Sequence, residues 1–353
     1  MQSFSFLFRC PNMKQNQQHN TILDLAAALK LSPATVSRAL NNNSNVKEET
    51  RKRVFEMSEK LGYRKNTMAA GLRNNKTNTV GLIVPKISMY FHAAAVTVIQ
   101  NLLHKEGYNL IIGQSNDDPL MEKDLADTMF SSRVDALIVS STLQTEDFSH
   151  FDIFADHQIP LLFYDRVPPV SYGASTIKGD DFRGGYLAGK HLAETGCKRI
   201  ALISGPLTSN LYQDRSAGFL SALKQFNLPV YEDLIYHQPL TAEYTTNAMR
   251  KMFSGANQPD ALFVTSDRNA VTALSFAKEH GIAVPEDLRI VGYSNDPVTA
   301  IISPSITTVE QFPAVLGGRL VEVLMDMLKN KGTVVVNPDP IITPVELIRR
   351  MSA

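Results

Sequence analysis

Apolar residues recur with the period of a helix in three segments near the start of the chain. The first, residues 22–29, has the i, i+3, i+4, i+7 spacing in Ile22, Leu25, Ala26 and Leu29. A second helix is predicted over residues 33–41, with Val36 and Leu40 as its inward pair. A third is predicted over residues 50–61, with Gly62 ending it and an inward face of Val54, Met57 and Leu61. The pattern predicts a small all-α unit.

The first two helices begin with residues that favour helix N-termini. Thr21 can cap the first helix, with Asp24 three residues later completing a capping box. Ser32 can cap the second, and Pro33 takes the first helical position, where its missing N–H costs nothing. Because only residues 29–31 separate the two helices, the segment is typical of a helix-turn-helix.

From residue 79 onward, short apolar runs alternate with helical patterns. The runs predict strands at 80–84, 109–112, 135–140, 160–165, 199–204, 260–267 and 289–294. The helical patterns cover residues 93–106, 122–131, 182–194 and 269–280. This alternation predicts parallel, doubly wound sheets, and the length of the segment 79–353 suits two lobes.

The distribution of charge separates the two parts of the chain. The 353 residues have a formal net charge of zero, but residues 1–78 contain 13 basic and five acidic residues, a charge of +8. The rest of the chain therefore carries the opposite charge. A basic head on an acidic body indicates that the head binds a polyanion such as DNA.

The N-terminus and the cysteines indicate a cytoplasmic protein. Residues 1–18 contain a weak apolar patch with no basic residue before it and no small-residue cleavage site after it. We therefore expect a disordered tail rather than a secretory signal, and Met13 rather than Met1 as the start. Cys10 and Cys197 form neither a metal spacing nor a disulfide framework. No apolar run approaches the roughly 18 residues of a membrane span.

The outer face of the second helix carries residue types that contact DNA. Pro33 and Ala34 are small enough for this end of the helix to enter a major groove about 12 Å wide. Arg38 can offer two donors to a guanine edge or bind a phosphate. Further expected contacts, most of them to phosphate oxygens, are Thr21, Ser32, Thr35, Ser37 and Asn41. A generic helical hairpin would not need so polar a face.

The segment 21–63 resembles the DNA-binding head of the LacI/GalR (lactose-repressor) family of bacterial transcription regulators. The shared core is T-I-x-D-x-A, S-x-A-T-V-S-R-x-L-N, E-T-R-x-x-V and L-G-Y. Two positions depart from the family pattern. Lys30 replaces a turn glycine, so a non-glycine residue is expected to adopt an unfavourable backbone angle. Lys47 replaces a serine cap, which leaves Asn45 as a substitute cap.

Residues 63–78 correspond to the family's hinge, which forms a helix on operator DNA. The resemblance implies that Leu72 wedges into the minor groove and kinks the duplex, with Ala69 packed behind it. Gly71 lowers helix propensity, so the hinge is expected to depend on DNA and on dimerisation. The alternative for Leu72 is a linker leucine that packs against the body.

The body resembles the family's effector-binding core, which is related to periplasmic sugar-binding proteins. The matching motifs are YDRVPP, GDDFRGGYLAGKHL, CKRIALISGP, RSAGF, TSDRNAV, GIAVPEDLRIVGYSNDP and SPSITTVEQ. The resemblance implies an α/β protein, in which an all-α helix-turn-helix head precedes a two-lobed, doubly wound body of the type I periplasmic-binding-protein class.

The domains expected from this resemblance are a tail at 1–18, a head at 19–62, a hinge at 63–78 and an effector-binding and dimerisation domain at 79–353. The chain is expected to cross between lobes near Tyr164, Tyr293 and Val321. The N-lobe would then comprise about 79–163 and 294–320, and the C-lobe about 164–293 and 321–353.

The fold implies a small-molecule effector in the cleft between the lobes, at the carboxyl ends of the strands. Tyr90 and Phe91 match a position that stacks on a sugar or base ring. Arg215 matches a ligand-gripping arginine whose donors suit hydroxyls, a carboxylate or a phosphate. Asp165 follows a strand at a crossing, although it can instead pair with Arg166. The other candidates are Ser266, Asp267, Ser294, Asn295 and Asp296. Ser294 stands where the family often has an acid, and a neighbouring residue is expected to take over that role.

A long apolar helix pattern begins near Val315. Together with Val96, Ile99 and Leu103, it offers more apolar surface than one lobe needs. Because family dimers pack through the body, we expect an isologous homodimer that presents two recognition helices to a palindromic operator.

No motif indicates an enzyme, so no catalytic residue, cofactor or metal is expected. There is no Walker loop, no H-E-x-x-H and no Cys/His cluster, and the FRGGYLAG glycines are expected to serve close packing. The expected function is a sequence-specific regulator, a repressor by resemblance, that binds operator DNA and is controlled by a sugar or sugar derivative. The alternative is a solute-binding protein of a sugar transport system, which the basic head and the lack of a signal sequence disfavour.

Overall fold

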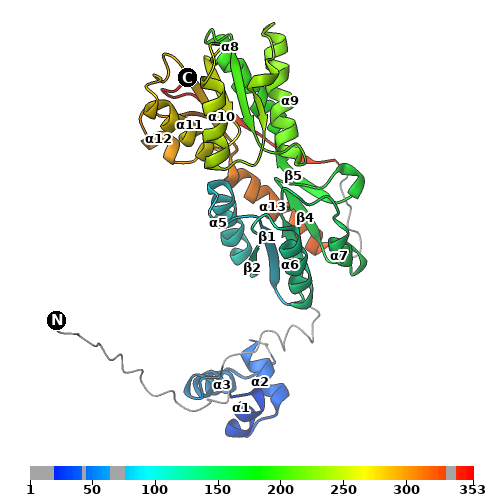
Figure 1. Cartoon of the computed structure of the whole chain (residues 1–353). Coiled ribbons are helices and arrows are strands. Elements are labelled where there is room, and N and C mark those ends of the chain that lie inside the picture. The colour runs from blue at the N-terminus through cyan, green and yellow to red at the C-terminus, as the bar shows by residue number, and fades with distance from the viewer. Residues whose placement is uncertain (1–19, 42–44, 64–75, 331–338) are drawn as a thin grey trace, which may run out of the picture. The chain divides into compact units, whose positions relative to one another are not determined.

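The computed structural model describes residues 20–41, 45–63, 76–330 and 339–353, which fall into two compact units, 1–76 and 77–353. The predicted tail, 1–18, and most of the predicted hinge lie outside the described residues. The first unit is helical, and the second is built from helices and mostly parallel strands (Figure 1).

Three helices make up the described part of the first unit: α1 (Ile22–Leu29), α2 (Pro33–Leu40) and α3 (Glu48–Lys60). All three predicted helices are confirmed. Their inward faces meet in one small core, in which Leu25, Val36 and Val54 have no exposed area. Helices of 8 to 13 residues are marginal in isolation, so this shared core holds them.

The predicted caps of α1 and α2 are formed. Thr21 Oγ1 accepts the Asp24 N–H at 3.4 Å, while the Asp24 carboxylate accepts the Thr21 N–H at 2.7 Å. Ser32 Oγ accepts the Thr35 N–H at 3.1 Å. Lys30 has φ 51° and ψ 42°, the left-handed conformation predicted from its position in the turn.

The start of α3 differs from the prediction. The N-cap is Lys47, whose side chain makes no capping hydrogen bond, and Asn45 lies two residues before it. The prediction that Asn45 caps this helix is therefore wrong. Two acidic residues in the first turn, Glu48 and Glu49, favour the helix dipole and allow α3 to begin two residues earlier than predicted.

Within its described residues, the second unit contains two six-stranded sheets, each covered by helices on both faces. The first sheet has the order β11-β5-β4-β3-β1-β2, with every pairing parallel. Its strands are β1 (Thr79–Val84), β2 (Asn109–Gln114), β3 (Ala136–Val139), β4 (Leu161–Tyr164), β5 (Ser175–Gly179) and β11 (Ile341–Thr343). Its helices are α5 (Tyr90–Lys105), α6 (Pro119–Ser131), α7 (Asp152–Asp156) and α13 (Pro313–Lys329). We call this part the N-lobe.

The second sheet has the order β12-β10-β9-β8-β6-β7 and is parallel except for β10 with β12. Its strands are β6 (Ile200–Ser204), β7 (Ile235–His237), β8 (Ala261–Val264), β9 (Arg289–Tyr293), β10 (Thr307–Glu310) and β12 (Glu346–Ile348). Its helices are α8 (Asp181–Glu194), α9 (Asn210–Gln225), α10 (Ala242–Phe253), α11 (Asp267–Glu279) and α12 (Val298–Ile301). We call this part the C-lobe.

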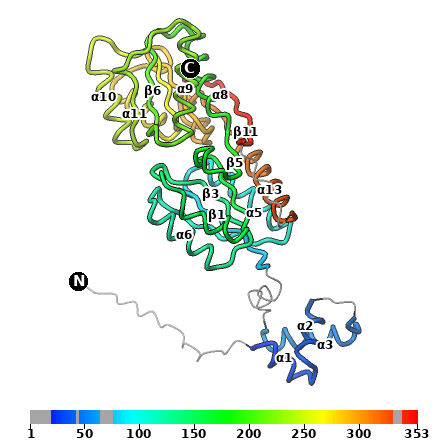
Figure 2. The backbone as a smooth tube through the Cα atoms, turned by 90° about the vertical axis from the view of Figure 1, so that its right-hand side faces the viewer, coloured from blue at the N-terminus to red at the C-terminus, as the bar shows by residue number. Residues whose placement is uncertain are grey.

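The chain crosses between the lobes at other places than predicted. It passes from β5 to α8 at Asp180, from β10 to α13 at residues 311–312, and from β11 to β12 at residues 344–345. The predicted crossings near Tyr164, Tyr293 and Val321 are therefore wrong. Tyr164 ends β4, which pairs with β5 in the same sheet. Figure 2 shows β5 beside β11, its other neighbour.

The seven predicted strands and four predicted helices of the body are confirmed, with shifts at their ends. The elements not predicted are β5, β7, β10, β11, β12, α7, α9, α10 and α12. The missed strands have at most five residues and are polar or only half-buried in places, so they lack the apolar run that marks a buried strand.

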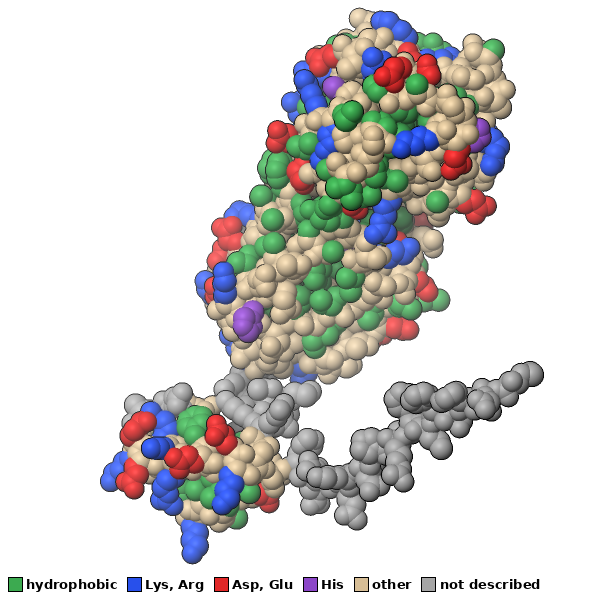
Figure 3. All heavy atoms as spheres, turned by 90° about the vertical axis from the view of Figure 1, so that its left-hand side faces the viewer, with side chains coloured by type: hydrophobic (Ala, Val, Ile, Leu, Met, Phe, Trp, Pro, Cys, Tyr) green, Lys and Arg blue, Asp and Glu red, His purple; other side chains and the backbone are tan. Residues whose placement is uncertain are grey.

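The predicted apolar dimer surface is largely internal. Val96, Ile99 and Leu103 of α5 are buried in one cluster with Leu316 and Leu320 of α13, because these two helices pack on each other. The expectation that they offer surface to a second copy is therefore wrong. Apolar side chains that do reach the surface include Ile111 and Ile112 of β2, 41% and 39% exposed, and Figure 3 shows apolar groups on one face of the body.

Candidate functional site

The outer face of α2 is the candidate DNA-binding surface. Val36 and Ala39 are buried, while Ser32, Pro33, Ala34, Arg38 and Asn41 are exposed and Thr35 and Ser37 are half-buried. The helix thus presents to solvent the polar and small residues predicted to meet DNA. Arg38 forms no ion pair with any residue that the structure describes.

Some of the predicted DNA contacts also hold the unit together. The Ser32 and Thr35 hydroxyls share a 2.8 Å hydrogen bond. Thr21 is committed to the capping box with Asp24. Thr21 and Ser32 are the N-caps of α1 and α2, and an anion is favoured at the N-terminus of a helix. Ala69 and Leu72 lie outside the described residues.

The second candidate site lies between the lobes, where Asp165 and Arg166 follow β4. Both residues are buried, and Asp165 has φ 60°, a left-handed conformation that is rare for a residue other than glycine. The Asn210 side chain of the C-lobe donates to the Asp165 carbonyl at 3.0 Å and accepts the Val167 N–H at 3.1 Å. This loop is therefore tied directly to α9 of the other lobe.

Arg215, predicted to grip the effector, is already paired inside the C-lobe. Its Nε donates to Asp181 Oδ1 at 2.7 Å and its Nη1 donates to the Thr265 carbonyl at 3.1 Å. The guanidinium also stacks 3.7 Å from the centroid of the Tyr293 ring. Burial lowers the pKa of Arg215, but Asp181, Tyr293, Tyr212 and Asp165 together raise it by more, so the guanidinium stays charged. The sequence did not reveal this pairing.

Asp267, also predicted to bind the effector, is hydrogen-bonded within the C-lobe. Its two carboxylate oxygens accept from Thr308 Oγ1 at 2.6 Å and from the Asp296 N–H at 2.7 Å. Burial raises the pKa of Asp267 to about 6, with these hydrogen bonds acting in the opposite direction. Ser266 precedes it at the N-cap of α11, where its side chain makes no capping hydrogen bond.

The predicted residues 294–296 lie against the second crossing between the lobes. Ser294 Oγ donates to Gln311 Oε1 at 2.9 Å, and Asn295 Nδ2 donates to Glu310 Oε2 at 2.7 Å. Ser294 has φ 118° and Asn295 has φ 49°. The segment is therefore hydrogen-bonded through its side chains to residues 310–311, where the chain crosses between the lobes.

The two predicted aromatic residues have different surroundings. Phe91 is buried in the N-lobe core, which leaves little of its ring for a ligand. Tyr90 is half-buried, and its pKa is raised by burial and by the nearby carboxylates of Glu310 and Asp296. Tyr90 of the N-lobe therefore lies near carboxylates of the C-lobe, those of Glu310 and Asp296.

Several buried polar groups at the interlobe site were not predicted. His92 Nδ1 lies 3.1 Å from the Tyr164 hydroxyl, and its Nε2 lies 3.9 Å from Asp165 Oδ2 without a hydrogen bond. Burial lowers the pKa of His92 to about 3, so the ring is neutral. Arg166 forms an ion pair with Asp117. The only signal in the sequence was the position of Arg166 and His92 next to predicted residues.

Two further contacts hold the lobes together at the rim of the cleft. Arg268, at the start of α11, donates to the Ser88 carbonyl of the loop after β1. Thr208, in the loop after β6, donates to the Leu143 carbonyl at 3.0 Å. These contacts join the two lobes on the side where the strands end.

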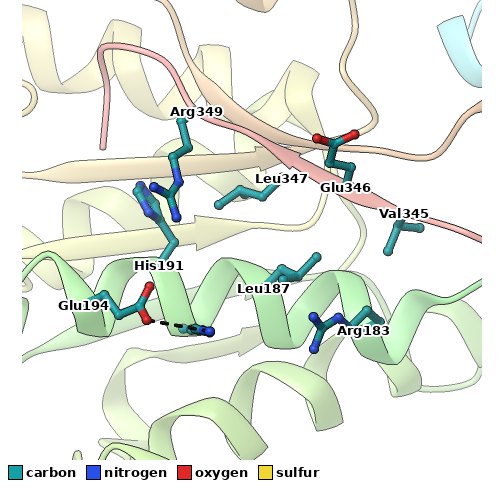
Figure 4. A pocket seen from close by; sticks show the side chains of 9 residues that line it. Arg183, Leu187, His191, Glu194, Val345, Glu346, Leu347 and Arg349 are labelled. Carbon is teal, nitrogen blue, oxygen red and sulfur yellow. Dashed lines mark ion pairs between the residues drawn. The ribbon is translucent and has the colours of Figure 1, made fainter.

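A cavity of about 340 Å³ lies elsewhere, between α8 and β12 of the C-lobe (Figure 4). Its lining includes Arg183, Lys190 and Arg349 around an apolar floor of Leu187 and Leu347. None of the predicted effector residues lines it.

The described residues carry neither a metal cluster nor a membrane span. No group of three or more His, Cys, Asp or Glu side chains converges within the described ranges. Every helix of the described part is too short or too polar to cross a bilayer.

Comparison with known proteins shows which family both parts of the chain resemble. Residues 21–66 match the family described as "Bacterial regulatory proteins, lacI family", and residues 190–353 match the "Periplasmic binding protein-like domain". The chain is 31% identical over 309 residues to the HTH-type transcriptional repressor PurR of Actinobacillus pleuropneumoniae serotype 3 (strain JL03), covering 88% of this chain and 91% of that protein. It is 33% identical over 315 residues to catabolite control protein A of Priestia megaterium, covering 89% and 94%.

A solved structure supports the same architecture. The transcriptional regulator CelR–cellobiose complex superposes with a TM-score of 0.71 at 25% identity, covering 95% of this chain and all of that one. The relatives are transcription regulators rather than enzymes or transport proteins, so the solute-binding alternative is not favoured. The chain belongs to the lacI family of bacterial regulatory proteins and is a DNA-binding transcription regulator with a small-molecule effector.

Proposed function

We propose that this chain is a cytoplasmic repressor that binds a palindromic operator as a homodimer and changes its operator affinity when an effector binds between its lobes. The observation that carries the proposal is the exposed outer face of α2, with Arg38 unpaired among the described residues. A helix that presents an arginine and small residues while burying Val36 and Ala39 is suited to a major groove.

In this proposal, Arg38 reads a base edge, and its neighbours hold the helix on the phosphates. Ser37 and Asn41 bind phosphate oxygens, as do Ser32 and Thr35 through their free lone pairs. Thr21 does the same at the start of α1. Pro33 and Ala34 let the helix approach the groove closely. Ala69 and Leu72 act at the minor groove, in the hinge.

The proposed effector site lies between the lobes and is formed by residues of both. Tyr90 offers a half-buried ring, Asp165 a carboxylate, and Ser266 a hydroxyl without a capping role. Arg215, Asp267 and residues 294–296 contribute mainly by shaping the C-lobe side, because their side chains are bonded within that lobe. A carbohydrate-like ligand is supported by the CelR complex, whose ligand is cellobiose.

The homodimer is supported by apolar side chains on the body surface. β2 is an edge strand of its sheet, and Ile111 and Ile112 of this strand are exposed. Ile301, in the C-lobe, is 82% exposed. Exposed apolar groups in both lobes suit an isologous contact that sets two heads on one operator.

Effector control follows from the way in which the lobes are joined. Three crossings and the contacts of Asn210, Arg268 and Thr208 connect the lobes. A ligand that binds between the lobes therefore shifts the equilibrium between their alternative relative positions. That change reaches the DNA through the segment before residue 77.

Selection of binding sites from random duplexes with the full-length chain tests this proposal. The expected result is a palindromic consensus whose half-sites are spaced by about one helical turn or a similar fixed distance. Lys123→Ala, on the exposed surface of α6, serves as a control that should select the same consensus. Enrichment of a single asymmetric site, or of no sequence, would count against a dimeric operator-binding regulator.

A further inference from the structure

Both arginines at the interlobe site already hold a carboxylate. Arg166 pairs with Asp117, and Arg215 pairs with Asp181 at 2.7 Å. Both guanidiniums are almost fully buried. Taking Arg215 for an anionic ligand would leave Asp181 buried without its partner, which is strongly unfavourable, whereas the Asp117 side chain is 20% exposed. Among the described residues, both of these guanidiniums are therefore engaged with a carboxylate, although Arg166 Nε has no hydrogen-bond partner.

Asp165, in contrast, is a buried carboxylate without a partner. Only 5% of the residue is exposed, and no hydrogen bond to its carboxylate occurs within the described part of the chain. His92 Nε2 lies 3.9 Å from this carboxylate, and burial keeps the ring neutral. An ionised group held in this way is destabilising until a ligand compensates it.

Asp165 lies at the boundary between the lobes, since its loop is hydrogen-bonded to Asn210 of α9. Its carboxylate interacts electrostatically with Asp181 and Arg215, which belong to the C-lobe, and with Arg166 of its own loop. Burial raises the pKa of Asp165 to about 6, with Asp181 adding to the increase and the two arginines opposing it. At neutral pH the carboxylate is still mostly ionised, so the site keeps a negative charge.

The C-lobe side of the cleft near Tyr90 is also acidic. Glu310 and Asp296 both act on Tyr90, and neither forms an ion pair among the described residues. Glu310 accepts from Asn295 and from the Phe312 N–H, both of which are uncharged donors. An aromatic ring beside unpaired carboxylates is an arrangement that attracts an ammonium group.

We infer that the effector of this regulator is a cation, an amine-bearing and hydroxyl-rich small molecule whose ammonium group binds the Asp165 carboxylate. The inference rests on the proposed function, since it assumes an effector between the lobes, and it adds the charge of that effector. The unpaired Asp165, the two occupied arginines and the acidic surroundings of Tyr90 all favour this charge. The hydroxyl groups of the ligand would bind the uncharged polar groups of the site.

The test is a panel of ligands matched in skeleton and differing in charge. Glucosamine, galactosamine and mannosamine are each compared with the parent sugar, the N-acetyl form and the 6-phosphate, using the full-length chain. Thermal shift ranks the panel, and calorimetry gives Kd for the compounds that bind. We expect an amine to bind about tenfold or more tightly than its uncharged parent, and the phosphates not to bind.

Two variants and a control connect the preference to the site. Asp165→Asn keeps the shape of the side chain and suits the left-handed backbone, so it should fold and lose the preference for the amine. Tyr90→Leu should weaken amine binding without affecting the fold. Asp118→Asn removes the same charge from an exposed N-cap, where asparagine caps equally well, and should change nothing.

Each other outcome of the panel overturns the inference. Tighter binding of a parent sugar or a phosphate would show that the site exists but does not select a cation. An amine preference that survives Asp165→Asn would assign the charge to another residue. If no amine in the panel binds, the cationic effector is rejected, while the selection of operator sites still decides separately whether the chain is a regulator.

Discussion

The Arg215 guanidinium is held between the Asp181 carboxylate, 2.7 Å from its Nε, and the Tyr293 ring, 3.7 Å below it. The Arg215 and Asp181 side chains are 5% and 1% exposed. Tyr293 also donates its hydroxyl hydrogen to Asp181 Oδ1 at 3.0 Å. This arrangement makes Arg215 a fixed part of the C-lobe, whereas the sequence analysis predicted only that it binds the ligand.

Arg215→Ala should lower the free energy of unfolding by about 3–5 kcal/mol, because it leaves Asp181 buried without its cation. Urea unfolding of the full chain followed by circular dichroism measures the change. Arg319→Ala is the matched control, since Arg319 pairs with Glu322 at 2.6 Å on the surface of α13 and should cost about 0–1 kcal/mol. Equal losses of unfolding free energy in the two variants would show that the buried Arg215–Asp181 pair contributes no more to stability than the exposed Arg319–Glu322 pair.

Asp165→Asn should stabilise the chain at neutral pH. Because the pKa of Asp165 rises to about 6 on folding, the folded state prefers the protonated form, and stability falls as the pH rises through about 6. The variant lacks this loss, so it should match the wild type near pH 4 and be more stable by an amount on the order of 3 kcal/mol at pH 7. Unfolding curves at a series of pH values give the difference, and a difference independent of pH would contradict the assignment.

Gly185→Ala should be strongly destabilising, since a Cβ at this position of α8 would lie 1.9 Å from the Arg215 carbonyl oxygen of α9. The two helices would have to separate, which we expect to cost about 2–3 kcal/mol. Gly318→Ala provides the contrast, because nothing lies within 4 Å of a Cβ there and helix propensity alone should stabilise by about 0.5–1 kcal/mol. Thermal unfolding of both variants tests the pair, and a loss of stability in Gly318→Ala would refute the packing argument.

Close packing at the glycines of α8 is one feature that the sequence did predict. The glycines of FRGGYLAG were expected to serve close packing, and Gly184, Gly185 and Gly189 all lie where a Cβ would meet a neighbouring atom within 3 Å. The caps at Thr21 and Ser32 were also predictable, because a capping box is read from residues three positions apart. Local signals of this kind carry their geometry in their spacing.

Contacts between distant residues could not be predicted in this way. Asp181 lies 34 residues before Arg215, and nothing in the spacing connects them. The first crossing was misplaced because β5 reads STIKG, a short and partly polar segment without the apolar run of β4. With β5 missed, the chain seemed to leave the N-lobe one strand too early.

Lys30→Gly should stabilise the helix-turn-helix. Lys30 holds φ 51°, which costs an L-residue roughly 1–2 kcal/mol, while glycine adopts it freely but loses more entropy on folding. The net gain should be about 0.5–1 kcal/mol, measured by hydrogen exchange of the amides of α1 and α2 in the full chain. Lys30→Ala controls for loss of the lysine and should give no gain. Equal protection in the two variants would mean that the turn is not strained.

The most direct test of the regulator assignment is the affinity of the wild type and Arg38→Ala for the selected operator and for a scrambled duplex at one salt concentration. Lys52→Ala, on the exposed face of α3, controls for the loss of one positive charge. If Arg38 reads a base, Arg38→Ala should lose about 1–3 kcal/mol on the operator and little on the scrambled duplex. The Lys52→Ala variant should affect both duplexes alike. An equal loss on both duplexes with Arg38→Ala, or no loss on either, would contradict sequence recognition by α2.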